Sequence, residues 1–249
     1  MPSFRLGINY WPAQTAMAMW SRFDPSVLDG DFARIAGAGL ESVRFFLLWE
    51  TFQPHEDRID AEACALLERF LDLLAAHGLR GMPTLFCGHM SGVNWLPQWT
   101  LDVATPHGRF RTISNGRISS YGIGDFYEAG PLLDAQIFAV RTLGARFRNH
   151  PTIEAWDLGN EFSNLREPRS PQHAAAWSKT LSDALAEASG HPVTGGIHGE
   201  DLEYDRRIRP GSICAPWGFA TMHGYSGYST FSRGGTDTEV VPFLYDLVS

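Results

Sequence analysis

The sequence has little cysteine, little charge and no long apolar run. Its three cysteines, Cys64, Cys87 and Cys214, lie far apart and form no CxxC spacing. A disulfide framework is therefore not expected, and buried free thiols are. Charged residues make up only 19% of the 249 residues and hydrophobic residues 44%, a balance that excludes a disordered chain and supplies a full core.

Basic clusters and targeting segments are also lacking. The formal charge is −8 and the basic residues form no long run, which argues against nucleic acid or an acidic membrane as partner. No stretch approaches the ~20 apolar residues that span a membrane, and the first residues carry no apolar run of signal-peptide length. A cytoplasmic protein without a membrane partner is expected, although a trimmed secreted protein would look the same.

What is present is a regular alternation of strand and helix patterns. Apolar strand-like segments occupy 4–10, 42–50, 80–89, 152–161, 192–199 and 219–228. Helical patterns follow them, opened by Asp24-Pro25, Asp60, Pro131 and Ser170-Pro171, with a last helix beginning near Asp237. Such alternation predicts a parallel sheet covered by helices and a single domain over residues 1–249.

Two parallel architectures compete, a (β/α)₈ TIM barrel and an open doubly wound sheet. The open sheet normally carries a glycine-rich phosphate turn after its first strand, whereas here the turn NYWPAQTAMAMW has no glycine. We therefore predict the α/β barrel. It is incomplete, because about six units are present and strands seven and eight are missing. The first and sixth strands become open edges, and the core around Leu6, Ile8 and Met222 is expected to be partly wet.

Polar and aromatic side chains gather where the strands end. In a barrel these carboxyl ends form the active face. The ends are Asn9-Tyr10-Trp11, Trp49-Glu50, His89, Asn160-Glu161, His198 with Glu200, and His223-Gly224-Tyr225. A long segment from about 90 to 130, with a hairpin at Asn115-Gly116, adds a loop of the length that usually serves function.

Glu161 is the sharpest candidate for catalysis. It ends the apolar strand AWDLGNE directly after an amide, Asn160. A glycosidic bond needs a carboxylic acid that protonates the leaving oxygen, and an adjacent amide can bind a sugar hydroxyl. Because neighbouring strand residues point to opposite faces, both can serve one site only if the strand ends or bulges there.

The order of GINYWP, SVRFF, the Asn-Glu pair and HGY resembles the glycoside hydrolases of clan A, especially family 5, over nearly the whole chain from about residue 4. The run LFCGHMSGVNWLPQW is similar to β-mannanase-like members. The resemblance implies that Arg44 supports the nucleophile and that Glu161 is the acid/base. It further implies substrate-binding roles for four residues, namely His89, Asn160, His223 and Tyr225. Phe162 replaces the usual proline, and the nucleophile glutamate of strand seven and the tryptophan of strand eight have no counterpart.

Other candidates carry weaker patterns. Five of the eight tryptophans, Trp11, Trp49, Trp95, Trp99 and Trp217, lie at strand ends or in the following loops, where an indole can stack on a sugar or pack a loop. Trp49 and Trp95 are taken as substrate-binding candidates. Glu50, His198 and Glu200 can equally be site residues or ordinary loop residues.

We predict a retaining glycoside hydrolase acting on a β-linked glycan of mannan or glucan type. Its nucleophile lies beyond residue 249, in the missing C-terminal part of the same barrel, so the fragment alone is expected to be inactive. No cofactor and no metal are expected. Two alternatives stay open: an inactive or carbohydrate-binding barrel fragment, and a metal-dependent barrel hydrolase that uses His89, His198 and His223.

Overall fold

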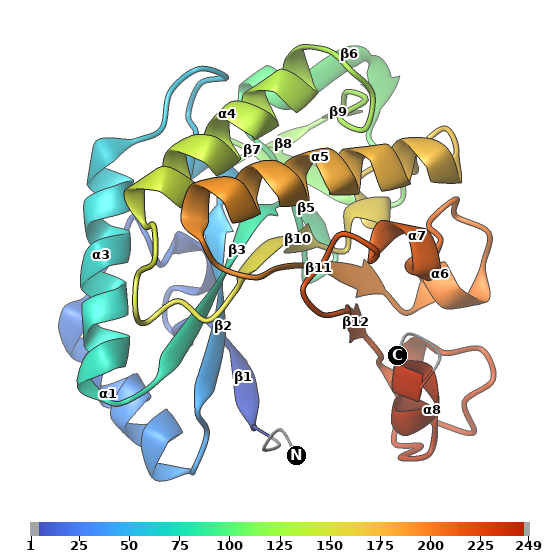
Figure 1. Cartoon of the computed structure of the whole chain (residues 1–249). Coiled ribbons are helices and arrows are strands. Elements are labelled where there is room, and N and C mark those ends of the chain that lie inside the picture. Colours follow the sequence, from blue (N-terminus) through green and yellow to red (C-terminus); the bar gives the residue numbers. More distant parts are fainter. Residues whose placement is uncertain (1–4, 247–249) are drawn as a thin grey trace.

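A single parallel sheet organises the chain. The computed structural model describes residues 5–246. Its six main strands are β1 (Gly7–Tyr10), β2 (Ser42–Leu48), β3 (Arg80–Cys87), β10 (Trp156–Asn160), β11 (Val193–His198) and β12 (Thr221–His223). They pair in parallel and in strict sequence order (Figure 1). A doubly wound sheet would reverse its strand order, so the predicted barrel type is confirmed, as a curled half-barrel.

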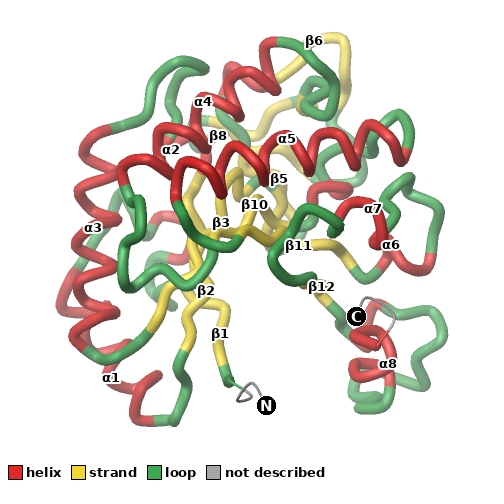
Figure 2. The backbone as a smooth tube through the Cα atoms, viewed as in Figure 1, coloured by secondary structure: helices red, strands yellow, loops and turns green. Residues whose placement is uncertain are grey.

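Helices cover the outer face of this sheet. The long ones are α1 (Pro25–Gly37), α3 (Ala61–Ala76), α4 (Pro131–Arg146) and α5 (Pro171–Ser189), and they lie along one side of the strands in Figure 2. Their ends follow the sequence signals: the Asp24 and Asp60 side chains accept hydrogen bonds from backbone N–H groups of the first turn, and Gly190 closes α5 with a φ of 72°. No helix among residues 5–246 is long and apolar enough to cross a membrane.

The core lies between the sheet and its helices. Phe45 of β2 packs on Phe70 of α3 with ring centroids 4.3 Å apart, and Phe70 meets Phe32 of α1 at 5.1 Å. Trp156 and Trp177 are fully buried. Most side chains of the central strands are apolar on both faces, as predicted, and the polar exceptions within them include Arg44, Thr84 and Asp157.

The two edge strands differ in how well they are covered. Leu6, just before β1, and Ile8 on β1 are 52% and 40% exposed, as predicted for an open edge. The prediction for Met222 on β12 is wrong, because it is 2% exposed and packs against Val240 and Leu244 of the last helix, α8 (Val240–Asp246). That helix therefore shields one edge of the half-barrel.

Two further boundaries depart from the sequence prediction. The first strand begins at Gly7, and the Phe4 at which we placed its start lies outside the described residues. The last helix begins at Val240, because the carboxylate of Asp237 instead binds Arg233. Between β11 and β12 the chain forms only the four-residue helices α6 (Glu200–Glu203) and α7 (Pro210–Ile213).

The segment after β3 is more structured than a loop. Residues 88–130, here called the insertion, hold two small sheets with strands β4 (His89–Met90), β5 (Val93–Trp95), β6 (Leu101–Pro106), β7 (Arg111–Ser114), β8 (Arg117–Ser119) and β9 (Tyr121–Ile123). The hairpin predicted at Asn115-Gly116 joins β7 to β8, and both residues have the positive φ values that its tight turn requires.

Candidate active site

A cavity of about 480 Å³ opens at the carboxyl ends of the main strands. Six of the predicted residues line it together: Arg44, His89, Asn160, Glu161, His223 and Tyr225. They come from β2, β3, β10 and β12 or from the residues just after them, so the parallel sheet alone accounts for their convergence.

The end of β10 explains how Asn160 and Glu161 share one site. The pairing of β10 with β11 shifts register between Asp157 and Asn160, and Glu161 adopts the left-handed conformation with φ 52° and ψ 55°. This conformation is unfavourable for a residue with a side chain. It breaks the strand's alternation, so two consecutive side chains reach the same cavity.

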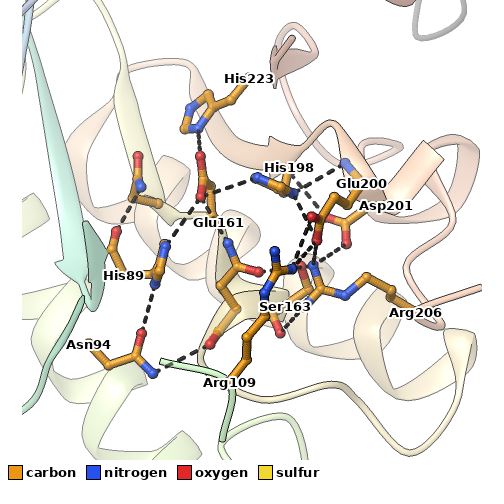
Figure 3. A network of polar contacts seen from close by, with 12 residues as sticks. His89, Asn94, Arg109, Glu161, Ser163, His198, Glu200, Asp201, Arg206 and His223 are labelled. Carbon is orange, nitrogen blue, oxygen red and sulfur yellow. Dashed lines mark hydrogen bonds and ion pairs between the residues drawn. The ribbon is translucent and has the colours of Figure 1, made fainter. Parts of the chain in front are cut away.

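The Glu161 carboxylate is held on both oxygens. His223 Nδ1 lies 2.9 Å from Oε1, and Asn164 Nδ2, from the 3₁₀ helix η3 (Phe162–Asn164), donates to Oε2 at 2.9 Å. The Nε2 atoms of His89 and His198 each lie 3.6 Å from Oε2 (Figure 3). Burial acts to raise the pKa of Glu161, but the His223 hydrogen bond and the electrostatic interactions with His198, His223 and His89 outweigh it and leave the pKa below its ordinary value.

The hydrogen bonds of two histidines assign their neutral tautomers. His198 Nδ1 accepts from the backbone N–H of Glu200 at 3.2 Å, so its proton lies on Nε2 and faces Glu161. His89 Nδ1 lies 2.8 Å from the amide oxygen of Asn94, so its proton lies on Nδ1 and Nε2 presents a lone pair. Burial lowers the pKa of His89, with the Asn94 bond and Glu161 opposing, so the ring is neutral at pH 7. Oε2 of Glu161 thus faces a hydrogen-bond donor, His198 Nε2, and an acceptor, His89 Nε2.

Arg44 anchors the floor of the cavity. Its Nη2 and Nε lie 2.5 and 2.7 Å from Oδ2 of Asp157, a β10 carboxylate that also accepts from Thr84 Oγ1 at 2.8 Å. Arg44 donates to Oδ1 of Asn160 as well, at 3.1 Å. The sequence analysis missed Asp157, although a mid-strand arginine needs a buried partner and this is the acid on the strand that carries Glu161.

Replacing Arg44 with alanine should lower the free energy of unfolding by about 3–5 kcal/mol, because the Asp157 side chain, 1% exposed, would keep a buried charge without its partner. The measurement is urea denaturation followed by tryptophan fluorescence. Arg34→Ala is the matched control, since its pair with Asp31 on α1 leaves the arginine side chain 75% exposed, and a change within about 1 kcal/mol is expected there. Equal effects of the two substitutions would contradict the anchoring role.

Two predicted tryptophans lie outside the cavity. Trp49 is 2% exposed and opens the short helix α2 (Trp49–Phe52), where its Nε1 donates to Gln53 at 2.8 Å; it packs the insertion onto the core through Trp99. Trp95 lies on β5, paired with β7, and packs against the main core. Neither side chain lines the cavity, because both indoles pack into or against the main core.

Aromatic residues of the cavity come from other positions. Trp11 lines it beside Phe46, and Tyr225 and Tyr228 line its open side with exposures of 53% and 70%. Of the undecided candidates, His198 and Glu200 belong to the cavity, whereas Glu50 bonds the hairpin backbone at Asn115. Arg109 and Phe110 of the insertion also line the cavity and carried no recognisable sequence signal.

No group of three or more His, Cys, Asp or Glu side chains among residues 5–246 is arranged to hold a metal ion. The nearest arrangement is the histidine set around Glu161. There the His223 Nδ1 atom contacts the Glu161 carboxylate, and Nδ1 of His89 and of His198 contact Asn94 and Glu200. These nitrogens are committed to protein partners.

Comparison with known proteins was made at the levels of sequence and structure. No protein-family model matches the sequence, and no curated protein does. Solved structures do match. An exo-β-1,4-mannosidase from Opitutaceae bacterium strain TAV5 is similar with a TM-score of 0.82 and 23% identity, over 99% of this chain and 43% of that one.

Two other solved structures extend this likeness. A GH5_18 protein from Streptomyces cattleya, in complex with Manβ1-4GlcNAc, has a TM-score of 0.79 and 23% identity over 95% of this chain and 55% of that one. The endo-1,4-β-mannanase from Rhizomucor miehei has a TM-score of 0.71 and 16% identity, covering 99% and 73%. The chain therefore shares its fold with these three structures, and it spans about half the length of the first two.

Proposed function

We propose that this chain is part of a retaining glycoside hydrolase that acts on a β-linked glycan of mannan or glucan type, with Glu161 as its acid/base. The observation that carries the proposal is the position of Glu161: a cavity-lining carboxylate at the end of the fourth barrel strand, fixed by His223 and Asn164. The similarity to two mannosidase or mannanase structures supports the same chemistry.

The mechanism divides between two carboxyl groups. Glu161 protonates the leaving oxygen while a second carboxylate, about 5–5.5 Å away, attacks the anomeric carbon and forms a glycosyl-enzyme. Glu161 then deprotonates the water that hydrolyses this intermediate. Asn160, oriented by Arg44, offers its amide to a sugar hydroxyl beside the reacting carbon.

The second carboxylate is proposed to lie beyond residue 249. Glu200 is the other carboxylate that lines the cavity among the described residues, and both its oxygens bind Arg109 Nη1, at 2.9 and 2.7 Å. A nucleophile facing Glu161 would also raise the pKa of Glu161 through repulsion of like charges, and a general acid needs this raised pKa.

The cavity surface is suited to a neutral sugar. Trp11, Tyr225 and Tyr228 offer partly exposed aromatic rings on its open side, where they can cover the apolar face of a pyranose. His89, Asn160 and His198 also line the cavity and offer polar atoms to sugar hydroxyl groups. The similarity to an exo-β-1,4-mannosidase and to a structure that binds Manβ1-4GlcNAc favours a β-mannoside before a β-glucoside.

The test is hydrolysis of aryl β-mannosides and β-glucosides by the protein extended through the next two βα units of its gene. NMR follows the anomeric proton of the first-formed sugar. Retention predicts the β-anomer before mutarotation. An α-anomer would contradict the retaining mechanism, and hydrolysis that stops on chelation of metal ions would favour the metal-dependent alternative.

A further inference from the structure

An ion pair bridges two loops over the end of β10. Arg109 belongs to the part of the insertion between β6 and β7, and Glu200 is the first residue of α6, just after β11. In the sheet, β10 lies between β3, which leads into the insertion, and β11. The pair therefore crosses the strand end that presents Glu161, and both of its members line the cavity.

The two members of the pair are held differently. The Glu200 side chain is 14% exposed and is also approached by Arg206 Nη1 at 3.3 Å and His198 Nδ1 at 3.7 Å (Figure 3). The Arg109 side chain is 63% exposed, and its guanidinium lies 5.0 Å over the ring of Phe110. The Glu200 side chain is thus held in place by several contacts, whereas the exposed Arg109 side chain can be shortened by substitution.

Independent contacts bring the insertion to the same place. Arg166, which follows η3, donates to the carbonyl oxygen of Ile123 at 3.1 Å and to Thr105 Oγ1 at 3.5 Å. On the inner side, the Phe110 ring lies 4.3 Å from the ring of His89. Arg109, Phe110 and Glu200 thus line the β10 side of the cavity together.

The opposite side of the cavity is built differently. Trp11, Tyr225 and Tyr228 line it, the two tyrosines with exposed rings, and no ion pair joins them among the described residues. These rings can stack on sugar units, whereas on the β10 side a bound glycan meets the ion pair.

We propose that Arg109 and Glu200 make the cavity blind at the β10 side, so that it accepts the end of a glycan chain and excludes an internal stretch. This inference rests on the proposed glycosidase function and specifies its substrate class: terminal units of β-linked oligosaccharides. The wall acts by steric exclusion and by the cost of separating a charged pair, so shortening Arg109 removes it.

The experiment measures binding and uses the extended protein with Glu161→Gln present in every variant and in the otherwise wild-type protein, so that the ligands are not hydrolysed and the self-association expected of residues 1–249 is avoided. Isothermal titration of β-1,4-manno-oligosaccharides and cello-oligosaccharides of two to six units is combined with migration through a native gel that contains the soluble polymer. The variants are Arg109→Ala and Glu200→Gln, and the matched control is Arg117→Ala, an exposed arginine of β8 in the same insertion. Circular dichroism of each variant shows whether it is folded.

The wild-type protein and Arg117→Ala should bind short oligosaccharides, and their affinity should not increase further as the oligosaccharide becomes longer. Their migration in the gel should not be retarded by the polymer. Arg109→Ala should gain affinity for the longest oligosaccharide by about tenfold, equivalent to ~1.4 kcal/mol, and should be retarded by the polymer. Glu200→Gln should change in the same direction, since it keeps the size of the side chain and removes its charge.

Two outcomes separate the possible errors. If oligosaccharides bind and Arg109→Ala keeps the wild-type dependence on length, or if the polymer retards the wild type, the blind wall is wrong and the glycosidase proposal stands. If no β-linked oligosaccharide binds to any variant or to the extended protein, the glycosidase proposal itself fails and this inference fails with it.

Discussion

Replacing Glu161 with glutamine in the extended protein should reduce turnover of unactivated β-glycosides by about 10²–10⁴-fold, the usual contribution of a positioned general acid. The loss should be much smaller for aryl glycosides with good leaving groups, because these depart without protonation. Glutamine keeps the shape of the side chain and the hydrogen bond from Asn164, so the substitution removes the proton and little else. The measurement is kcat/KM, which reports the first step and therefore the role of Glu161 as acid, across a series of leaving groups.

The leaving-group series separates acid catalysis from damage to the fold. Glu68→Gln is the matched control, since Glu68 pairs with Arg146 on the outer helices and has a half-exposed side chain. It should leave every rate unchanged. A Glu161→Gln variant whose loss is equal for good and poor leaving groups would show that Glu161 positions substrate and does not supply the proton.

Residues 1–249 alone should be inactive on β-mannan and β-glucan and should self-associate, whereas the extended protein should be active and monodisperse. The expected inactivity has a chemical reason. Without a second carboxylate opposite Glu161 nothing attacks the anomeric carbon, and loss of one member of a coupled pair costs orders of magnitude in rate.

The expected self-association follows from the exposed edge of the sheet. β1 is an edge strand whose unpaired backbone groups lie beside half-exposed Leu6 and Ile8, a template for pairing with another chain. Light scattering after size-exclusion chromatography compares the two lengths. Association is expected through the β1 edge and not through β12, because α8 covers Met222 on β12. A monomeric and active 1–249 would show that the nucleophile lies within these residues.

The sequence predicted the architecture and the centre of the candidate site because both follow from local patterns. Apolar strands that end in polar residues place Arg44, His89, Glu161 and His223 on one face once the strands are parallel. The caps at Asp24 and Asp60 and the hairpin at Asn115 were equally readable, since each depends on only a few neighbouring residues.

The parts that could not be predicted depend on contacts between distant segments. Trp49 and Trp95 satisfy the same sequence pattern as Trp11, and only the packing of the insertion decides which indole reaches the cavity. The Arg109–Glu200 bridge joins residues 91 positions apart. The left-handed turn at Glu161, which lets Asn160 and Glu161 share a site, has no signal in residue type, because glycine or asparagine would normally mark it.

The central claim is that Glu161 is the acid/base of a retaining glycosidase, and chemical rescue of Glu161→Ala by azide in the extended protein tests it most directly. With an activated aryl β-mannoside or β-glucoside, the glycosyl-enzyme should form and then wait, because no base activates water. Azide needs no base and fits the space that the side chain leaves. The account predicts faster turnover with azide and a β-glycosyl azide product by NMR. An α-glycosyl azide, or no azide adduct from a folded variant, would contradict it.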